Sequence, residues 1–220
     1  MIVTNAGYTI LTHIDGIEEL KHIEKIGRVC YKSEDKITDD GESAKKFVAM
    51  LIKNGHEAMI EHSTLAVKFI VDRGISHELV RHRVASFAQE STRYCNYTGE
   101  KFGSEINIIG IGKGIDIQNK LTNDEKFSVV GEWLDAMEDA EHHYQRMIGL
   151  GATPQIARSV LPTSTKTEIT ITANYREWRN IFKLRTAKAA HPQIREVMIP
   201  LLTELKSRIS IVFDDIKEEE

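Results

Sequence analysis

Residues 168–174 alternate between polar and apolar side chains, and this pattern constrains the fold more than any other stretch. The apolar positions are Ile169, Ile171 and Ala173, and a Glu or Thr stands before each of them. A period of two residues predicts a strand with one face buried. Residues 64–72 repeat the pattern with a single break. The chain must therefore contain a sheet that covers a core.

Other segments carry apolar residues at helical spacing instead. We expect helices over residues 16–31, 43–53, 76–84, 122–150, 154–160, 175–186 and 192–212. Short strands are expected within residues 2–13 and 105–111, and an irregular or extended binding segment over residues 86–97. These elements predict an α+β fold, with a central, mostly antiparallel sheet and flanking long helices.

The length of 220 residues fits a single domain spanning 1–220, with an acidic tail at 215–220 that we expect to fray. The net charge of −4 disfavours general nucleic-acid binding, which needs a positive excess. No apolar run is long enough to span a membrane, and the N-terminus does not resemble a signal peptide. Two cysteines without a CxxC pair disfavour a disulfide scaffold or a structural zinc. We expect a cytoplasmic protein.

Residues 81–94 hold the chain's most distinctive chemistry. Three arginines and a histidine fall within thirteen residues, among small, hydroxyl and amide side chains. The guanidinium group is always charged and binds phosphate or carboxylate oxygens with two parallel hydrogen bonds. Such a cluster predicts a site for a phosphorylated, base-like small molecule.

The same segment resembles a known family. Arg81-His82-Arg83, then seven residues, then Ser91, is similar to the Arg-His-Arg-x7-Ser signature of the flavin-dependent thymidylate synthases. Four more segments resemble family elements in the same order: Gly55-His-Glu-Ala-Met-Ile-Glu-His62, Ala157-Arg158-Ser-Val-Leu-Pro162, Thr172-Ala-Asn174-Tyr-Arg176 with Asn180, and Leu184-Arg185 before Ala190-His-Pro-Gln-Ile-Arg195. The resemblance covers roughly residues 55 to 200, and residues 98–122 have no match.

The resemblance implies reductive methylation of dUMP to dTMP. The carbon donor would be 5,10-methylenetetrahydrofolate, and FAD reduced by NADPH would be the hydride donor. It also implies a homotetramer whose active sites draw residues from several subunits. No cysteine nucleophile is implied, since Cys95 stands in no catalytic position of the family.

The resemblance also assigns residues. Arg185 would be catalytic, because a cation near N3 of uracil favours the ionised ring. The dUMP contacts would be Glu78, Leu79, Val80, Arg81, Gln89, Glu90, Ser91, Arg93, Arg158 and Arg185. The FAD contacts would be Thr64, Arg81, His82, Arg83, Gln89, Asn174, Tyr175, Arg176 and Asn180. His62 is a candidate contact for flavin or folate. Relatives differ at two of these positions: some have Gln at Glu78, and some have Glu at Gln89.

Plainer interpretations stand beside these. Without the resemblance, Arg158, Arg176 and Arg185 would be read as solvated charges, and we interpret Arg179 and Arg195 as surface charges. Ser91 suits a hydrogen-bond donor to phosphate better than a nucleophile, because no base is evident beside it.

Two other function classes remain open. One is a non-catalytic nucleotide- or RNA-binding module that uses the same arginines. The other is a metal-dependent phosphohydrolase built on the histidines of residues 56–82. We expect no metal, because in His77-Glu-Leu-Val-Arg81 an arginine replaces the second ligand of a His-Glu-x-x-His zinc motif. The glycines of residues 110–114 do not form a phosphate-binding loop, since no Gly-Lys-Ser/Thr follows them.

Overall fold

A computed structural model describes residues 1–99, 103, 105–112, 115 and 121–218. The chain forms two compact units, each assembled from three separate stretches. The first unit comprises Met1–Gly7, Phe69–Arg81 and Ala88–Thr170, and the second comprises Tyr8–Lys68, His82–Phe87 and Ile171–Glu220. The expected single domain stays a prediction.

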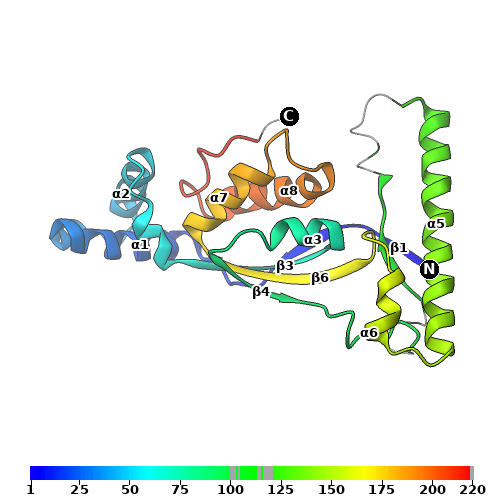
Figure 1. The fold of residues 1–220 in the computed structure, drawn as a ribbon. Coiled ribbons are helices and arrows are strands. Elements are labelled where there is room, and N and C mark those ends of the chain that lie inside the picture. The colour runs from blue at the N-terminus through cyan, green and yellow to red at the C-terminus, as the bar shows by residue number, and fades with distance from the viewer. Residues whose placement is uncertain (100–102, 104, 113–114, 116–120, 219–220) are drawn as a thin grey trace. The chain divides into compact units, whose positions relative to one another are not determined.

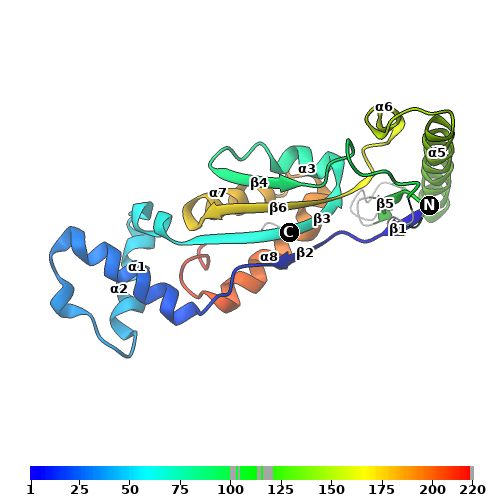
Figure 2. The ribbon, with the colours of Figure 1, turned by 90° about the horizontal axis from the view of Figure 1, so that it is seen from below.

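A four-stranded antiparallel sheet carries both predicted long strands. Its strands, in spatial order, are β2 (Gly7–Ile10), β3 (Thr64–Asp72), β6 (Lys166–Asn174) and β4 (Ala85–Gln89). Figure 2 shows this order. Alternate residues of β3 and β6 are buried, as the period of two predicted. A second sheet pairs β1 (Ile2–Thr4) with β5 (Asn107–Ile109) in parallel. The expected α+β class is confirmed.

In the second unit, four helices pack in two pairs (Figure 1). The pairs are α1 (Gly16–Tyr31) with α2 (Glu42–Lys53), and α7 (Tyr175–Arg185) with α8 (Pro192–Arg208). Short 3-10 turns, η1 (Glu34–Lys36) and η2 (Glu57–His62), connect the elements. Trp178, Phe182 and Phe213 are fully buried and pack ring against ring, so α7 is anchored along its apolar side.

In the first unit, α5 (Asn123–Gly149) is the longest helix. It begins with a capping box in which Thr122 and Glu125 exchange hydrogen bonds. Met137 and Tyr144 of α5 share an apolar cluster with Ile108 of β5. Other helical segments of this unit are α3 (Arg73–Leu79), α6 (Pro154–Ala157) and η4 (Arg158–Val160).

Three predicted boundaries are wrong. The helix expected at 76–84 is α3 and ends at Leu79, so Arg81 to Arg83 lie outside it, before β4. Asp72 starts α3 earlier than expected, because its carboxylate accepts a hydrogen bond from the Ile75 amide at 2.6 Å. The helix expected at 192–212 ends at Arg208, and Ile211 beyond it has a left-handed backbone conformation with φ of 77°.

The expectation of a frayed tail is wrong for residues 215–218. Asp215 pairs with Arg179, and the side chain of Ile216 is buried. Lys206 donates a hydrogen bond to the Ile216 carbonyl at 2.8 Å and pairs with Glu218 at 3.3 Å. The acidic side chains that suggested a frayed tail therefore bind Arg179 and Lys206 and hold residues 215–218 in place. Residues 219–220 of the expected tail lie outside the described residues.

Candidate functional site

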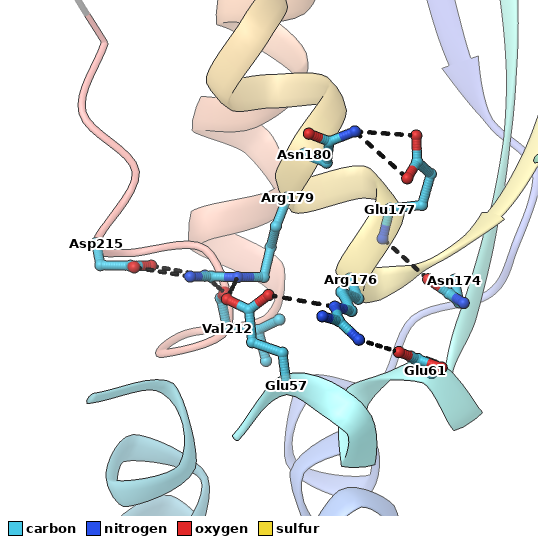
Figure 3. A network of polar contacts seen from close by, with 9 residues as sticks. All are labelled: Glu57, Glu61, Asn174, Arg176, Glu177, Arg179, Asn180, Val212 and Asp215. Atoms are coloured by element: carbon cyan, nitrogen blue, oxygen red, sulfur yellow. Dashed lines mark hydrogen bonds and ion pairs between the residues drawn. The ribbon is translucent and has the colours of Figure 1, made fainter. Parts of the chain in front are cut away.

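A cavity of about 380 Å³ opens beside the first turns of α7. Its lining residues are Glu57, Glu61, Val84, Asn174, Arg176, Glu177, Asn180 and Lys183, all from the second unit. Asn174 caps α7, because its Oδ1 accepts a hydrogen bond from the Glu177 amide at 2.9 Å. Three residues predicted to contact flavin, Asn174, Arg176 and Asn180, thus lie on one cavity. Figure 3 shows their side chains at the start of α7.

Arg176 is held at the cavity by two carboxylates. Its Nη1 lies 2.5 Å from Oε1 of Glu61, and its Nε lies 3.8 Å from Oε2 of Glu57. These pairs raise the pKa of the Arg176 guanidinium, and the hydrogen bond that Arg176 donates to Glu61 raises it most strongly. More than half of the Arg176 side chain remains exposed, so the guanidinium is accessible to a ligand.

Arg179 is not the surface charge that we expected. Its side chain is buried, and it donates hydrogen bonds to Glu57 at 3.0 Å, to both oxygens of Asp215 and to the Val212 carbonyl (Figure 3). The spacing of residues in the sequence could have indicated this burial. Residue 179 lies four positions after Tyr175, on the same helical side as the other buried residues of α7.

His82 connects α7 to the start of β4. It is buried, and its Nε2 lies 3.1 Å from Nε of Arg185, while its Nδ1 lies 3.3 Å from Oε1 of Glu177. Burial lowers the pKa of His82, and the positive charge of Arg185 lowers it further, although Glu177 opposes both. His82 is therefore neutral near pH 7. The structure brings the predicted catalytic Arg185 and the predicted flavin contact His82 together.

The other predicted flavin contacts are placed differently. Tyr175 is fully buried against Phe213, and burial raises the pKa of its hydroxyl, so its side chain is not available to a ligand. His62 and Thr64 are exposed where η2 meets β3, and Arg81 and Arg83 are exposed on either side of His82.

A second cluster of predicted residues lies in the first unit. Nη1 of Arg158 lies 3.3 Å from the Thr92 hydroxyl, and Nε of Arg93 lies 3.3 Å from Oε1 of Gln155. The Arg93 amide donates to the Ser91 hydroxyl, also at 3.3 Å. Two arginines and a serine predicted to bind dUMP thus gather around the turn that follows β4, where Arg93 and Arg158 are both exposed.

Two predicted dUMP residues before this turn make internal contacts. The Glu90 carboxylate accepts a hydrogen bond from Tyr97 at 2.9 Å and pairs with Lys166 at 3.3 Å. Burial, reinforced by the charge of Glu90, raises the pKa of the Tyr97 hydroxyl. Gln89 donates to the Ser76 hydroxyl at 2.9 Å. These contacts connect the two residues before Ser91 to Ser76, Tyr97 and Lys166.

The residues predicted at the end of α3 differ in exposure. Leu79 is fully buried in the core, so its side chain cannot reach a ligand. Glu78 is half-buried, and Val80 is exposed. Of these three, Glu78 and Val80 have side chains available to solvent.

The donors of both clusters suit anionic, hydrogen-bonding ligands such as nucleotides. Within the described ranges, no three His, Cys, Asp or Glu residues are grouped so that they could hold a metal ion. The same part of the chain contains no helix that is long and apolar enough to cross a membrane.

Comparisons with known proteins agree with this chemistry. Residues 10–209 match the family model described as "Thymidylate synthase complementing protein". A flavin-dependent thymidylate synthase of Corynebacterium aurimucosum is 34% identical over 202 residues, which cover 88% of this chain and 78% of the relative. One of Mycobacterium tuberculosis is 30% identical over 199 residues, with coverage of 89% and 78%.

A solved structure is also similar. It is a UMP/dUMP methylase, PolB, from Streptomyces cacaoi, bound with 5-Br dUMP. The TM-score is 0.78 at 25% identity, and the match covers 97% of this chain and 96% of the other. The likeness extends over both compact units.

Proposed function

We propose that this chain, which belongs to the flavin-dependent thymidylate synthase family, converts dUMP to dTMP with 5,10-methylenetetrahydrofolate, NADPH and FAD. The family makes the chain a flavin-dependent methyltransferase. One observation carries the finer assignment: Asn174, Arg176 and Asn180, matched to the family's flavin segment, lie on a single cavity. The similar methylase that binds 5-Br dUMP supports a uracil nucleotide as substrate.

The cavity fits part of a flavin dinucleotide. Arg176 and Lys183 supply cations for its phosphates, and Asn174 keeps an amide donor, since only its oxygen is used in capping α7. Two of the cavity carboxylates have partners other than Arg176 and Lys183, so they compete less with a bound anion: Glu57 pairs with Arg179, and Glu177 with Asn180 and His82. These residues would hold the flavin, and the chemistry it would supply there is hydride transfer.

The substrate would be held by the arginines. Arg93, with the backbone around Ser91, suits the phosphate dianion of dUMP, and Arg158 suits a uracil carbonyl. Arg185 would lie near N3 and lower its pKa, because an adjacent cation stabilises the ionised ring. Ionisation at N3 enriches electron density at C5, so the ring itself can attack the one-carbon unit. A cysteine nucleophile is then not needed.

Two further assignments follow from the family. The active enzyme would be a homotetramer whose sites combine residues of several subunits, and it would act in the cytoplasm. The partners would be dUMP, folate, NADPH and further copies of this chain, with no nucleic acid and no membrane.

A direct experiment tests the function. The purified protein is expected to show flavin absorbance and, with FAD, dUMP, methylenetetrahydrofolate and NADPH, to form dTMP. Omission of any one component from protein depleted of flavin should abolish dTMP formation. A colourless protein that binds RNA in a salt-sensitive manner and forms no dTMP would overturn the proposal in favour of a binding module. Activity lost to a chelator, without flavin, would favour a metal-dependent hydrolase.

A further inference from the structure

We propose that Glu177 is a positioning residue for Arg185, acting through the imidazole of His82. The proposal rests on the function above, in which Arg185 faces the uracil ring. The sequence resemblance assigns no role to Glu177. The three residues all belong to the second unit, so the chain of contacts lies within one compact body.

The hydrogen bonds fix the tautomer of His82. The Nε–H of Arg185 can only donate, so Nε2 of His82, 3.1 Å away, must be the acceptor. In a neutral imidazole the other nitrogen then carries the proton. Nδ1–H therefore donates to Oε1 of Glu177 at 3.3 Å. A carboxylate accepts but does not donate, so Glu177 selects the tautomer that leaves Nε2 free to receive Arg185.

Glu177 is itself held in place. Its amide donates to the Asn174 side chain, and its carboxylate accepts from Nδ2 of Asn180 at 3.3 and 3.4 Å. It lies in the first turn of α7, where the helix dipole stabilises a negative charge. Only 11% of its side chain is exposed. A fixed carboxylate orients the imidazole, and the imidazole limits where the Arg185 guanidinium can lie.

The arrangement works only while His82 is neutral. Protonation would give Nε2 a hydrogen that points at Arg185, which replaces a hydrogen bond with repulsion between two cations. The charged groups that face His82 are Arg185 and Glu177. Since burial and Arg185 both lower the pKa of His82, the neutral form persists below the ordinary value of 6.5.

The tautomer can be measured without any ligand. The 15N chemical shifts of imidazole nitrogens distinguish Nδ1–H, Nε2–H and the imidazolium, and a His82→Gln variant identifies the signal. At neutral pH we expect Nδ1–H in the wild type, a loss of that preference in Glu177→Ala, and no change in Glu61→Gln. The Glu61 variant is a matched control, because Glu61 lines the same cavity but pairs with Arg176. An Nε2–H tautomer or an imidazolium in the wild type would overturn the proposal, even if the variants fail to fold.

Kinetics then test the role in the reaction. Glu177→Ala should lower kcat for dTMP formation about 10- to 100-fold, because Arg185 is displaced. Glu177→Gln keeps a hydrogen-bond acceptor and should restore most of kcat. The acid limb of its kcat–pH profile should nevertheless move to lower pH, because the negative charge that raised the pKa of His82 is gone. A wild type that forms no dTMP overturns the proposed function. A wild type that forms dTMP, with Glu177→Ala equally active, overturns only the positioning role.

Discussion

The guanidinium of Arg179 and the carboxylate of Asp215 form two parallel hydrogen bonds, of 2.6 and 2.7 Å. Only 1% of Arg179 is exposed. Its Nε also donates to Glu57, which lines the cavity and lies near Arg176. This buried cation therefore connects the end of the chain, the middle of α7 and the wall of the candidate flavin site.

Loss of Arg179 should destabilise the protein severely. Arg179→Ala leaves a buried void and removes the cation from Glu57 and Asp215. Breaking a buried pair costs about 3–5 kcal/mol, and we expect the lower end of this range because 47% of the Asp215 side chain is exposed to solvent. The matched control is Arg208→Ala on α8, whose pair with Glu204 is partly exposed and contributes about 1 kcal/mol or less. Urea unfolding of both variants measures the difference. Equal stability of the two variants would contradict the role given to Arg179.

The ion pair between Asp215 and Arg179 should make the free energy of unfolding depend on pH in the acidic range. Hydrogen bonding to Arg179 lowers the pKa of Asp215 below its ordinary value of 3.8. Because the folded-state pKa is the lower one, the stabilisation is fully present above pH 3.8 and is lost as the pH falls through the folded value. Asp215→Asn lacks this contribution. Urea unfolding from neutral pH to below 3.8 should show wild type and variant converging in acid, whereas a constant gap would contradict the pairing.

The sequence predicted the regular elements well where one pattern dominated. The strands β3 and β6 lie where the alternation placed them, and α1 matches its predicted bounds of 16–31. The predicted helix boundaries were wrong where tertiary contacts set the end of the helix. A side-chain cap at Asp72 moved α3 toward the N-terminus, and burial of Val212 and Phe213 ended α8 early.

The candidate site was predicted only in part, for a physical reason. Sequence resemblance identified Asn174, Arg176 and Asn180, which share the cavity. The resemblance does not distinguish Tyr175 from its neighbours Asn174 and Arg176. The helical spacing of the apolar residues that follow indicates that Tyr175 points into the core, and the structure buries it there. Glu177 was missed because a glutamate in a first helical turn resembles an ordinary solvated charge.

Arg185 and Cys95 separate two mechanisms for activating uracil. If a cation at N3 activates the ring, Arg185→Ala should lose most dTMP formation, about 100-fold or more. Cys95→Ser should keep most activity, because no covalent bond to sulfur is needed. Steady-state assays with saturating dUMP measure both variants. The reverse pattern would indicate a thiolate nucleophile and overturn the mechanism.

Two glycines should respond oppositely to alanine. A Cβ at Gly16 would overlap the carbonyl oxygen of Arg208, where α1 begins beside the end of α8, so Gly16→Ala should destabilise by about 1–3 kcal/mol. Gly131 lies inside α5, and apart from the backbone of α5 itself, no atom of the described residues lies within 4 Å of an added Cβ. Gly131→Ala should stabilise by about 0.5–1 kcal/mol, since alanine favours helix over glycine. Thermal unfolding tests both signs, and destabilisation by Gly131→Ala would contradict the open surface described at that position.

Arg176 and Glu61 should affect flavin retention in opposite directions. If Arg176 holds a phosphate of the cofactor, Arg176→Ala removes that cation and should weaken FAD binding about tenfold or more. Glu61 competes for the same guanidinium through a pair whose two side chains are 55% and 41% exposed. Such an exposed pair is worth about 0.2–1 kcal/mol, so Glu61→Gln should tighten FAD binding by no more than about fivefold. Fluorescence titration of FAD into protein depleted of flavin measures both constants. If Glu61→Gln weakens binding instead, then Glu61 orients Arg176 rather than competing for it, and the cofactor phosphate must be held by other cations.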